Sequence, residues 1–107
     1  MLRKSLIYRT SAGVEAYTEY VDSLADRVGA AKIRARVTRA ELGNFGGHKN
    51  IGHGVIELRI DRGPGYRVYI GLHGGELLVL LCAGDKSSQR KDILRALVYW
   101  SDYKNNL

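Results

Sequence analysis

The spacing of apolar residues changes from a helical period to a strand period close to Phe45, and this change limits the possible folds more than any other feature of the chain. Before Phe45, apolar residues recur every three or four positions in two segments, which is typical of amphipathic helices. After it, apolar and polar residues alternate in short segments, which is typical of half-buried strands. The 107 residues suffice for one hydrophobic core, so we expect one domain spanning residues 1–107.

The first part of the chain predicts a short strand and two helices. Residues 4–9 predict the strand, and residues 10–13 predict a turn that caps the first helix. That helix would bury four apolar residues at helical spacing: Val14, Tyr17, Val21 and Leu24. Asp26 would cap a second helix, which ends at Gly43 and Asn44. Three arginines lie away from its apolar stripe, and we expect them on a solvated face: Arg34, Arg36 and Arg39.

The second part predicts a sheet and a final helix. Glycines bracket residues 48–53, which predict an edge strand or a loop. Residues 55–61 and 66–70 alternate in polarity around a turn, and residues 77–83 are apolar on both faces, as in an interior strand. Ile93, Leu97 and Trp100 form the buried stripe of a C-terminal helix. The expected fold is α+β, with two N-terminal helices packed on a twisted antiparallel sheet of four to five strands and a C-terminal helix.

The chain is basic, with 17 Lys and Arg against 11 Asp and Glu and a formal charge of +6. This surplus favours polyanions or acidic proteins as partners. No apolar run approaches the ~20 residues that cross a bilayer, and the first residues lack the pattern of a signal peptide. The single cysteine, Cys82, lies in an apolar segment typical of a core. We therefore expect a cytoplasmic protein that does not bind a membrane.

Four polar residues should converge on one face of the predicted hairpin: Glu57, Arg59, Arg67 and Tyr69. The alternation places the apolar residues on the other face, toward the helices: Ile56, Leu58, Ile60, Val68 and Ile70. A carboxylate flanked by two guanidinium groups has its pKa lowered and stays ionised. This arrangement fits a general base, and it equally fits a solvated ladder of cross-strand ion pairs.

Lys86 follows the predicted interior strand and precedes a helix, where backbone N–H groups and the helix dipole favour an anion. It would complete a concave positive surface, or it is a solvated lysine beside a capping Asp85. His48 and His53 stand five residues apart without a cysteine or carboxylate pattern, so we expect no metal site and no cofactor.

Several motifs resemble those of a known family: Gly47-His48-Lys49, Gly52-His53-Gly54-Val55, Glu57-Leu58-Arg59-Ile60-Asp61, Gly63-Pro64-Gly65-Tyr66-Arg67-Val68-Tyr69 and Gly84-Asp85-Lys86-Ser87-Ser88-Gln89. From about Tyr8 to Trp100 the chain resembles the RelE/ParE superfamily, in its HigB-like branch of addiction-module killer proteins. The resemblance implies a small basic toxin with two N-terminal helices on a twisted antiparallel sheet. Many RelE-type members cut messenger RNA on the ribosome without a metal, and an antitoxin encoded alongside neutralises each toxin.

The resemblance also implies roles for individual residues. Arg67 matches the strand arginine that holds the scissile phosphate, and Lys86 matches a basic residue that acts as general acid. Glu57 and Arg59 stand where RelE carries lysines and arginine, so Glu57 would be the base and Arg59 would stabilise charge. We also expect His48, Lys49 and Tyr69 to contact RNA.

The expected function is therefore the toxin of a type II toxin–antitoxin system, an mRNA endoribonuclease (mRNA interferase) that inhibits translation. Its expected partners are a small helix-turn-helix antitoxin and mRNA on the ribosome. Two alternatives stay open from the sequence. One is a non-enzymatic, ParE-like poison of DNA gyrase, and the other is a module that binds structured RNA without cleaving it.

Overall fold

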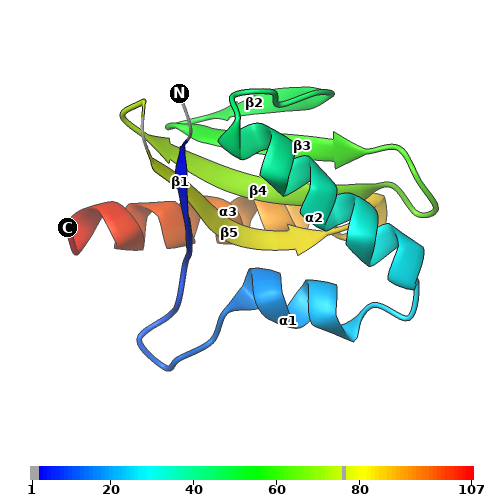
Figure 1. Cartoon of the computed structure of the whole chain (residues 1–107). Coiled ribbons are helices and arrows are strands. Elements are labelled where there is room, and N and C mark those ends of the chain that lie inside the picture. Colours follow the sequence, from blue (N-terminus) through cyan, green and yellow to red (C-terminus); the bar gives the residue numbers. More distant parts are fainter. Residues whose placement is uncertain (1–2, 76) are drawn as a thin grey trace.

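The computed structural model describes residues 3–75 and 77–107 of the chain, which fold into five strands and three helices (Figure 1). In chain order the elements are β1 (Lys4–Ile7), α1 (Ala16–Ser23), α2 (Arg27–Glu41), β2 (His48–Gly52), β3 (Val55–Ile60), β4 (Tyr66–His73), β5 (Leu77–Gly84), a 3₁₀ turn η1 (Lys86–Ser88) and α3 (Gln89–Asn105). No helix in this described part is long and apolar enough to cross a membrane.

The strands form one sheet in the order β1-β5-β4-β3-β2, with helices on both faces (Figure 1). The α+β class and the three expected helices are confirmed. One pairing differs from the expectation of a wholly antiparallel sheet, because β1 runs parallel to β5. The reason is topological: two helices and three strands separate β1 from β5, so the chain can return beside β1 in the same direction.

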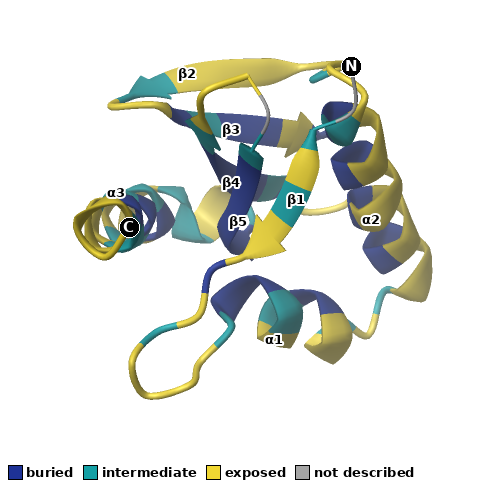
Figure 2. Cartoon of the chain, turned by 60° about the vertical axis from the view of Figure 1, so that its left-hand side comes forward, coloured by how far each residue is buried: buried dark blue, intermediate teal, exposed yellow. Residues whose placement is uncertain are grey.

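Helices α1 and α2 cover one face of the sheet. Their apolar sides pack on the strand residues that the alternation assigned to this face, including Leu58, Ile60, Val68 and Ile70. Helix α3 covers the opposite face, where Ala96 and Trp100 pack on Tyr69 and Cys82. Burial in the core confirms the expectation for Cys82 and Trp100, as Figure 2 shows for the side of α3 that faces the sheet.

The first helix begins later than the spacing predicts, at Ala16. The Val14 N–H donates to Thr10 Oγ1 at 3.0 Å, and Gly13 takes a left-handed φ of 85°, so residues 10–14 close a loop. Val14 is consequently 37% exposed and does not belong to the buried face.

Arg36 is buried, so its expected place on a solvated face is wrong. Its guanidinium donates to the carbonyl oxygens of Arg59, Phe45 (2.6 Å) and Gly47 (2.9 Å). No sequence period indicates such a role, because the acceptors are backbone groups that any residues could supply. Arg36 thereby ties α2 to the segment that enters β2.

Candidate functional site

Three cationic side chains surround a hollow of about 400 Å³ where β3 and β4 meet η1. Its lining comprises Arg59, Ile60, Asp61, Gly63, Pro64, Gly65, Arg67 and Lys86. We call this feature the cationic hollow. It brings together three of the four residues that the sequence assigns to catalysis, from three separate elements of the chain.

Strand register places the two arginines side by side. Arg59 on β3 lies directly opposite Arg67 on β4, so both side chains leave the sheet on the face that α3 covers. Arg67 in turn lies opposite Gly84, two residues before Lys86. The Lys86 N–H donates to the Pro64 carbonyl at 3.3 Å, which joins η1 to the β3–β4 turn.

The β3–β4 turn is held from behind by Asp26, the cap of α2. Asp26 accepts two hydrogen bonds from the Arg62 guanidinium, at 3.0 and 3.1 Å, and one from the Tyr66 hydroxyl at 2.9 Å. The bond from Arg62, together with those from the Gly29 N–H and Tyr66, holds the pKa of Asp26 well below its usual range. The turn that walls the hollow is therefore fixed to the start of α2.

Glu57 lies behind the hollow and has no exposed surface. Its Oε1 accepts from Arg59 Nε at 2.8 Å and lies 3.8 Å from Arg67 Nε, while Oε2 accepts from Tyr69 Oη and Gln89 Nε2, both at 2.9 Å. Burial alone would raise the pKa of Glu57, but the hydrogen bonds from Gln89, Arg59 and Tyr69 outweigh it and lower the pKa. The carboxylate is ionised and neutralises part of the arginine charge.

This burial corrects two expectations. A general base must come within hydrogen-bonding distance of the proton it takes, and Glu57 is enclosed with both oxygens occupied, so its assignment as base is wrong. Tyr69 is also fully buried, so its assignment as an RNA contact is wrong. Burial and the bond to Glu57 raise its pKa, and the neutral hydroxyl donates. Helix α3 covers this part of the polar face, which the alternation of the strands does not reveal.

Arg67 and Arg59 are anchored differently. Arg67 keeps 12% of its side chain exposed, and its Nη1 donates to the carbonyl oxygens of Gly65 (3.0 Å) and Tyr66 (3.4 Å). Arg59 keeps 43% exposed, and Glu57 is its one side-chain partner among the described residues. Arg67 is a rigid donor at the floor of the hollow, whereas Arg59 can adjust to what enters it.

Lys86 projects from a fixed backbone. Asp85 accepts from the Ser87 N–H at 2.8 Å, and the Ser87 hydroxyl, followed by that backbone group, lowers the pKa of Asp85. A methyl group at Gly65 would lie 3.2 Å from Arg67 Nη1 and 3.5 Å from Lys86 Cβ, so these two residues flank the same small glycine. The expected placement of Arg67 and Lys86 on one side is confirmed, and their catalytic roles stay predictions.

His48 and Lys49, the two residues of β2 expected to contact RNA, lie on opposite faces of the sheet. Lys49 lies opposite Glu57 and is exposed on the same face of the sheet as the cationic hollow. His48 lies opposite Leu58, on the other face, where its ring sits 5.6 Å from that of Phe45. The structure therefore places Lys49, and not His48, on the side of the hollow.

Two residues of the site had no role in the sequence analysis. Gln89 reaches Glu57 from the first turn of α3, and Asp61 is one of the residues that line the hollow. Asp61 could have been found, because it continues the alternation of Glu57 and Arg59. Gln89 ends the Gly84-to-Gln89 motif, but its partner is 32 residues away and nothing in its spacing points to Glu57.

The hollow is suited to hold an anion with phosphate geometry. Two guanidinium groups and one lysine line it, and guanidinium and ammonium groups both bind phosphate. Within residues 3–75 and 77–107, no three His, Cys, Asp or Glu side chains lie close enough to hold a metal ion.

Comparison with known proteins gives a relative of the chain. No family model matches the chain, and no solved structure matches it. The chain is 48% identical over 80 residues to a protein of Haemophilus influenzae described as uncharacterized, and the alignment covers 75% of this chain and 81% of that protein.

Proposed function

The chain belongs to the same family as this Haemophilus influenzae protein, and we propose that its cationic hollow is the active site of an endoribonuclease, the toxin of a type II toxin–antitoxin pair. The observation that carries the proposal is the convergence of Arg59, Arg67 and Lys86 on one hollow. Three cations face two carboxylates, the buried Glu57 and the lining Asp61, so a surplus of one positive charge remains. The remaining positive charge suits one phosphodiester group.

In the proposed reaction, the 2′-oxygen of a nucleotide attacks the adjacent phosphorus, and the bond from phosphorus to the 5′-oxygen breaks. Negative charge grows on the phosphoryl oxygens, where Arg67 and Arg59 donate hydrogen bonds. Lys86 gives its proton to the leaving 5′-oxygen. The products are a 2′,3′-cyclic phosphate and a 5′-hydroxyl end.

The proton of the 2′-hydroxyl goes to Asp61 in this proposal. Asp61 is exposed and lines the hollow, whereas Glu57 is enclosed. Glu57 acts as a positioning residue, because it fixes Arg59 and lies beside Arg67 Nε without touching the substrate. An RNA strand leaving the hollow along the sheet would pass Lys49.

The cellular setting belongs to the same proposal. A nuclease that cuts the messages of its own cell needs a partner that silences it, and we expect a small helix-turn-helix antitoxin. The substrate is messenger RNA on the ribosome, in the cytoplasm. The formal charge of +6 supports electrostatic attraction both to RNA and to an acidic antitoxin segment.

The test is cleavage of a translated message, followed by primer extension with and without ribosomes, for the parent and for Arg67→Ala. The proposal predicts a loss of about 10²–10³ in rate, since one preorganised charged donor is removed. Arg39→Ala is the matched control, because Arg39 is exposed on α2 and lies outside the hollow. Thermal unfolding shows whether each variant is folded.

Two results would reject the proposal. If folded Arg67→Ala cuts the message at the parent rate, the active site lies elsewhere. If the parent cuts nothing and instead inhibits supercoiling by gyrase, the protein is a poison of gyrase.

A further inference from the structure

Strand β1 forms one border of the sheet and has a strand on one side only. The sheet order places β5 beside it, and no described strand pairs with its outer side. At its start the outer side is covered by the end of α2, because the Arg3 N–H donates to the Glu41 carbonyl at 2.6 Å. The open part of the edge therefore runs from Ser5 to Arg9. Figure 2 shows β1 exposed beside the buried strands β5 and β4.

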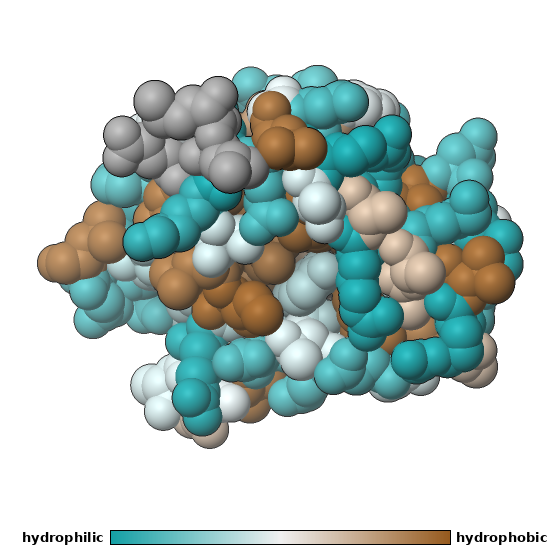
Figure 3. Space-filling view, in the orientation of Figure 1, coloured by the Kyte–Doolittle hydropathy of each residue, from teal (hydrophilic) through white to brown (hydrophobic). Residues whose placement is uncertain are grey.

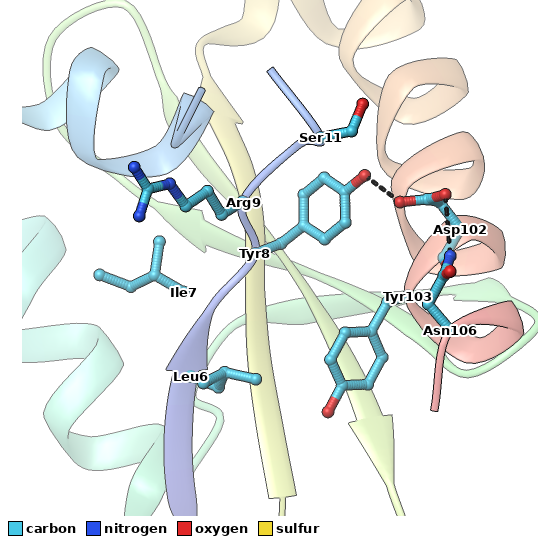
Figure 4. A pocket seen from close by; sticks show the side chains of 8 residues that line it. All are labelled: Leu6, Ile7, Tyr8, Arg9, Ser11, Asp102, Tyr103 and Asn106. Carbon is cyan, nitrogen blue, oxygen red and sulfur yellow. Dashed lines mark hydrogen bonds between the residues drawn. The ribbon is translucent and has the colours of Figure 1, made fainter. Parts of the chain in front are cut away.

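The edge presents apolar side chains on both faces. Leu6 is 44% exposed and Ile7 is 37% exposed. In Figure 4, Leu6 points toward Tyr103 on α3, and Ile7 points to the opposite side of the strand. Figure 3 shows hydrophobic surface around the position of β1, with hydrophilic groups bordering it. Exposed edge strands usually carry charges or bulges that prevent pairing, so two adjacent exposed apolar residues here are unusual.

A hollow of about 490 Å³ follows this edge, and we call it the edge groove (Figure 4). It is lined by Leu6, Ile7, Tyr8, Arg9, Ser11, Asp102, Tyr103 and Asn106. Successive residues of a strand point to opposite faces, so a groove that touches Leu6, Ile7, Tyr8 and Arg9 includes both faces of β1. An extended peptide beside β1 would contact both sets of side chains, whereas a small molecule would contact one.

The walls of the edge groove are already in place. The Tyr8 hydroxyl donates to Asp102 Oδ2 at 2.6 Å, and the Asn106 side chain donates to Asp102 Oδ1 at 3.2 Å. The Tyr8 ring stacks on Tyr99 with centroids 4.7 Å apart, and Trp100 stacks on Tyr103 at 5.5 Å. A partner that binds here would not need to order these side chains, which lowers the entropic cost of binding.

Charge at the edge selects the partner. Three described cations lie along this edge, Arg3, Lys4 and Arg9, and two carboxylates lie beside them, Glu41 and Asp102, which accept from the neutral hydroxyls of Ser5 and Tyr8. The net charge of these five side chains is therefore positive. A second copy of this basic chain would bring like charges together, whereas an acidic segment would neutralise them.

We propose that the outer edge of β1 is a docking site for an extended segment of a partner protein, in which acidic and apolar side chains alternate. The segment adds a sixth strand to the sheet through backbone hydrogen bonds, and its apolar side chains contact Leu6 and Ile7. This proposal does not depend on the reaction above, because no residue of the edge groove lines the cationic hollow.

The test uses an acetylated and amidated eight-residue peptide of alternating Glu and Val, with a Lys and Val peptide as its matched control. Amide resonances and hydrogen exchange of the full chain are followed by NMR. We expect the acidic peptide to slow exchange of the Ile7 amide and to shift resonances of residues 5–9. The lysine peptide should bind at least about tenfold more weakly, since the charge complementarity is reversed.

Two variants separate backbone pairing from side-chain contact. The Tyr8 N–H donates to Leu80 at 2.9 Å, so by alternation the Ile7 N–H faces outward, away from β5. Ile7→Pro removes this outward donor and leaves the hydrogen bonds to β5 intact. We expect it to lower the affinity for the acidic peptide about tenfold or more. Ile7→Ala keeps the N–H, so its loss of affinity for the acidic peptide should be about threefold smaller than that of Ile7→Pro. If Ile7→Pro does not fold, the Lys4→Glu/Arg9→Glu variant must instead prefer the lysine peptide.

Five outcomes would overturn the proposal. The acidic peptide does not bind, or it shifts only Arg59, Arg67 and Lys86. Ile7→Pro binds as well as the parent does. The parent associates with itself through β1, which makes a second copy the occupant. A single-stranded RNA oligonucleotide produces the shifts at residues 5–9, which makes the edge a nucleic-acid surface.

Discussion

At Glu57 the chain buries an ionised carboxylate completely, which is costly unless hydrogen bonds replace the lost water. Three donors supply them from three elements: Arg59 on β3, Tyr69 on β4 and Gln89 on α3. The arrangement fixes Arg59 Nε against the carboxylate and leaves 43% of the Arg59 side chain exposed. One residue thus connects the packing of α3 with the charge of the cationic hollow.

Replacing Glu57 by Gln should lower the free energy of unfolding by about 3 kcal/mol, because an amide cannot balance two guanidinium groups in a buried site. Urea denaturation measures the change. Glu19→Gln is the control, since Glu19 is exposed on α1 and should change stability by no more than about 0.5 kcal/mol. A Glu57→Gln variant as stable as this control would show that the buried ion pair does not stabilise the fold.

The sequence predicts the direction of the strand side chains but not which of them a helix covers. Alternation correctly places Glu57, Arg59 and Arg67 on one face, because the period of a strand fixes the direction of each side chain. The alternation does not reveal that Gln89 and α3 cover part of that face, because the position of a helix on a sheet depends on its packing with residues distant in sequence. For the same reason Arg36 and its backbone acceptors could not be predicted from its place on α2.

At the scale of elements, Asp26 joins α2 to the β3–β4 turn. It caps the helix through the Gly29 N–H at 2.9 Å and binds Arg62 and Tyr66 beyond it. The turn contains glycines with left-handed φ angles, Gly63 at 52° and Gly65 at 79°, and the Gly65 N–H donates to the Arg62 carbonyl at 3.0 Å. The Asp26 connection holds this turn, and with it one wall of the cationic hollow, against the start of α2.

The Asp26 connection should be sensitive to acid. Its pKa is lowered in the folded chain relative to the unfolded chain, so the unfolded state binds the proton first, and the stabilisation is lost as the pH falls below about 4. Asp26→Asn keeps a cap but loses the ion pair with Arg62. The difference in unfolding free energy between parent and variant should be present at pH 7 and shrink toward zero at low pH.

Denaturant melts across this pH range check the prediction. Asp22→Asn is the control, because Asp22 forms an exposed ion pair with Arg34 that contributes little at any pH. A difference for Asp26→Asn that stays constant with pH would mean that the carboxylate charge plays no part in holding the turn.

At the scale of the molecule, α3 lies on one face of the sheet while α1 and α2 lie on the other. The two sites proposed above occupy different ends of α3. Gln89 at its first turn supports the cationic hollow, and Asp102 near its last turn lines the edge groove. A partner at β1 and a strand of RNA could therefore occupy the molecule at the same time.

Binding of single-stranded RNA should depend on salt. One phosphodiester group neutralised in the cationic hollow contributes roughly −0.7 to the slope of the logarithm of affinity against the logarithm of salt concentration. Titration of a 2′-O-methyl RNA oligonucleotide, which cannot be cleaved by attack of its own 2′-oxygen, measures this slope. Arg67→Ala should make it shallower by about 0.7, and Arg39→Ala should not change it. Equal slopes for both variants would place the phosphate contacts outside the hollow.

The parallel pairing of β1 with β5 also bears on when the protein becomes complete during its own synthesis. The first strand must wait for nearly the whole chain before its neighbour exists, since Ile7 lies opposite Leu80. Lys86 and Gln89 follow still later in the chain. A ribosome making this protein therefore carries an unfinished hollow until the last helix has emerged. In the reaction proposed above, this order of assembly would protect the message that encodes the protein until the last helix has emerged.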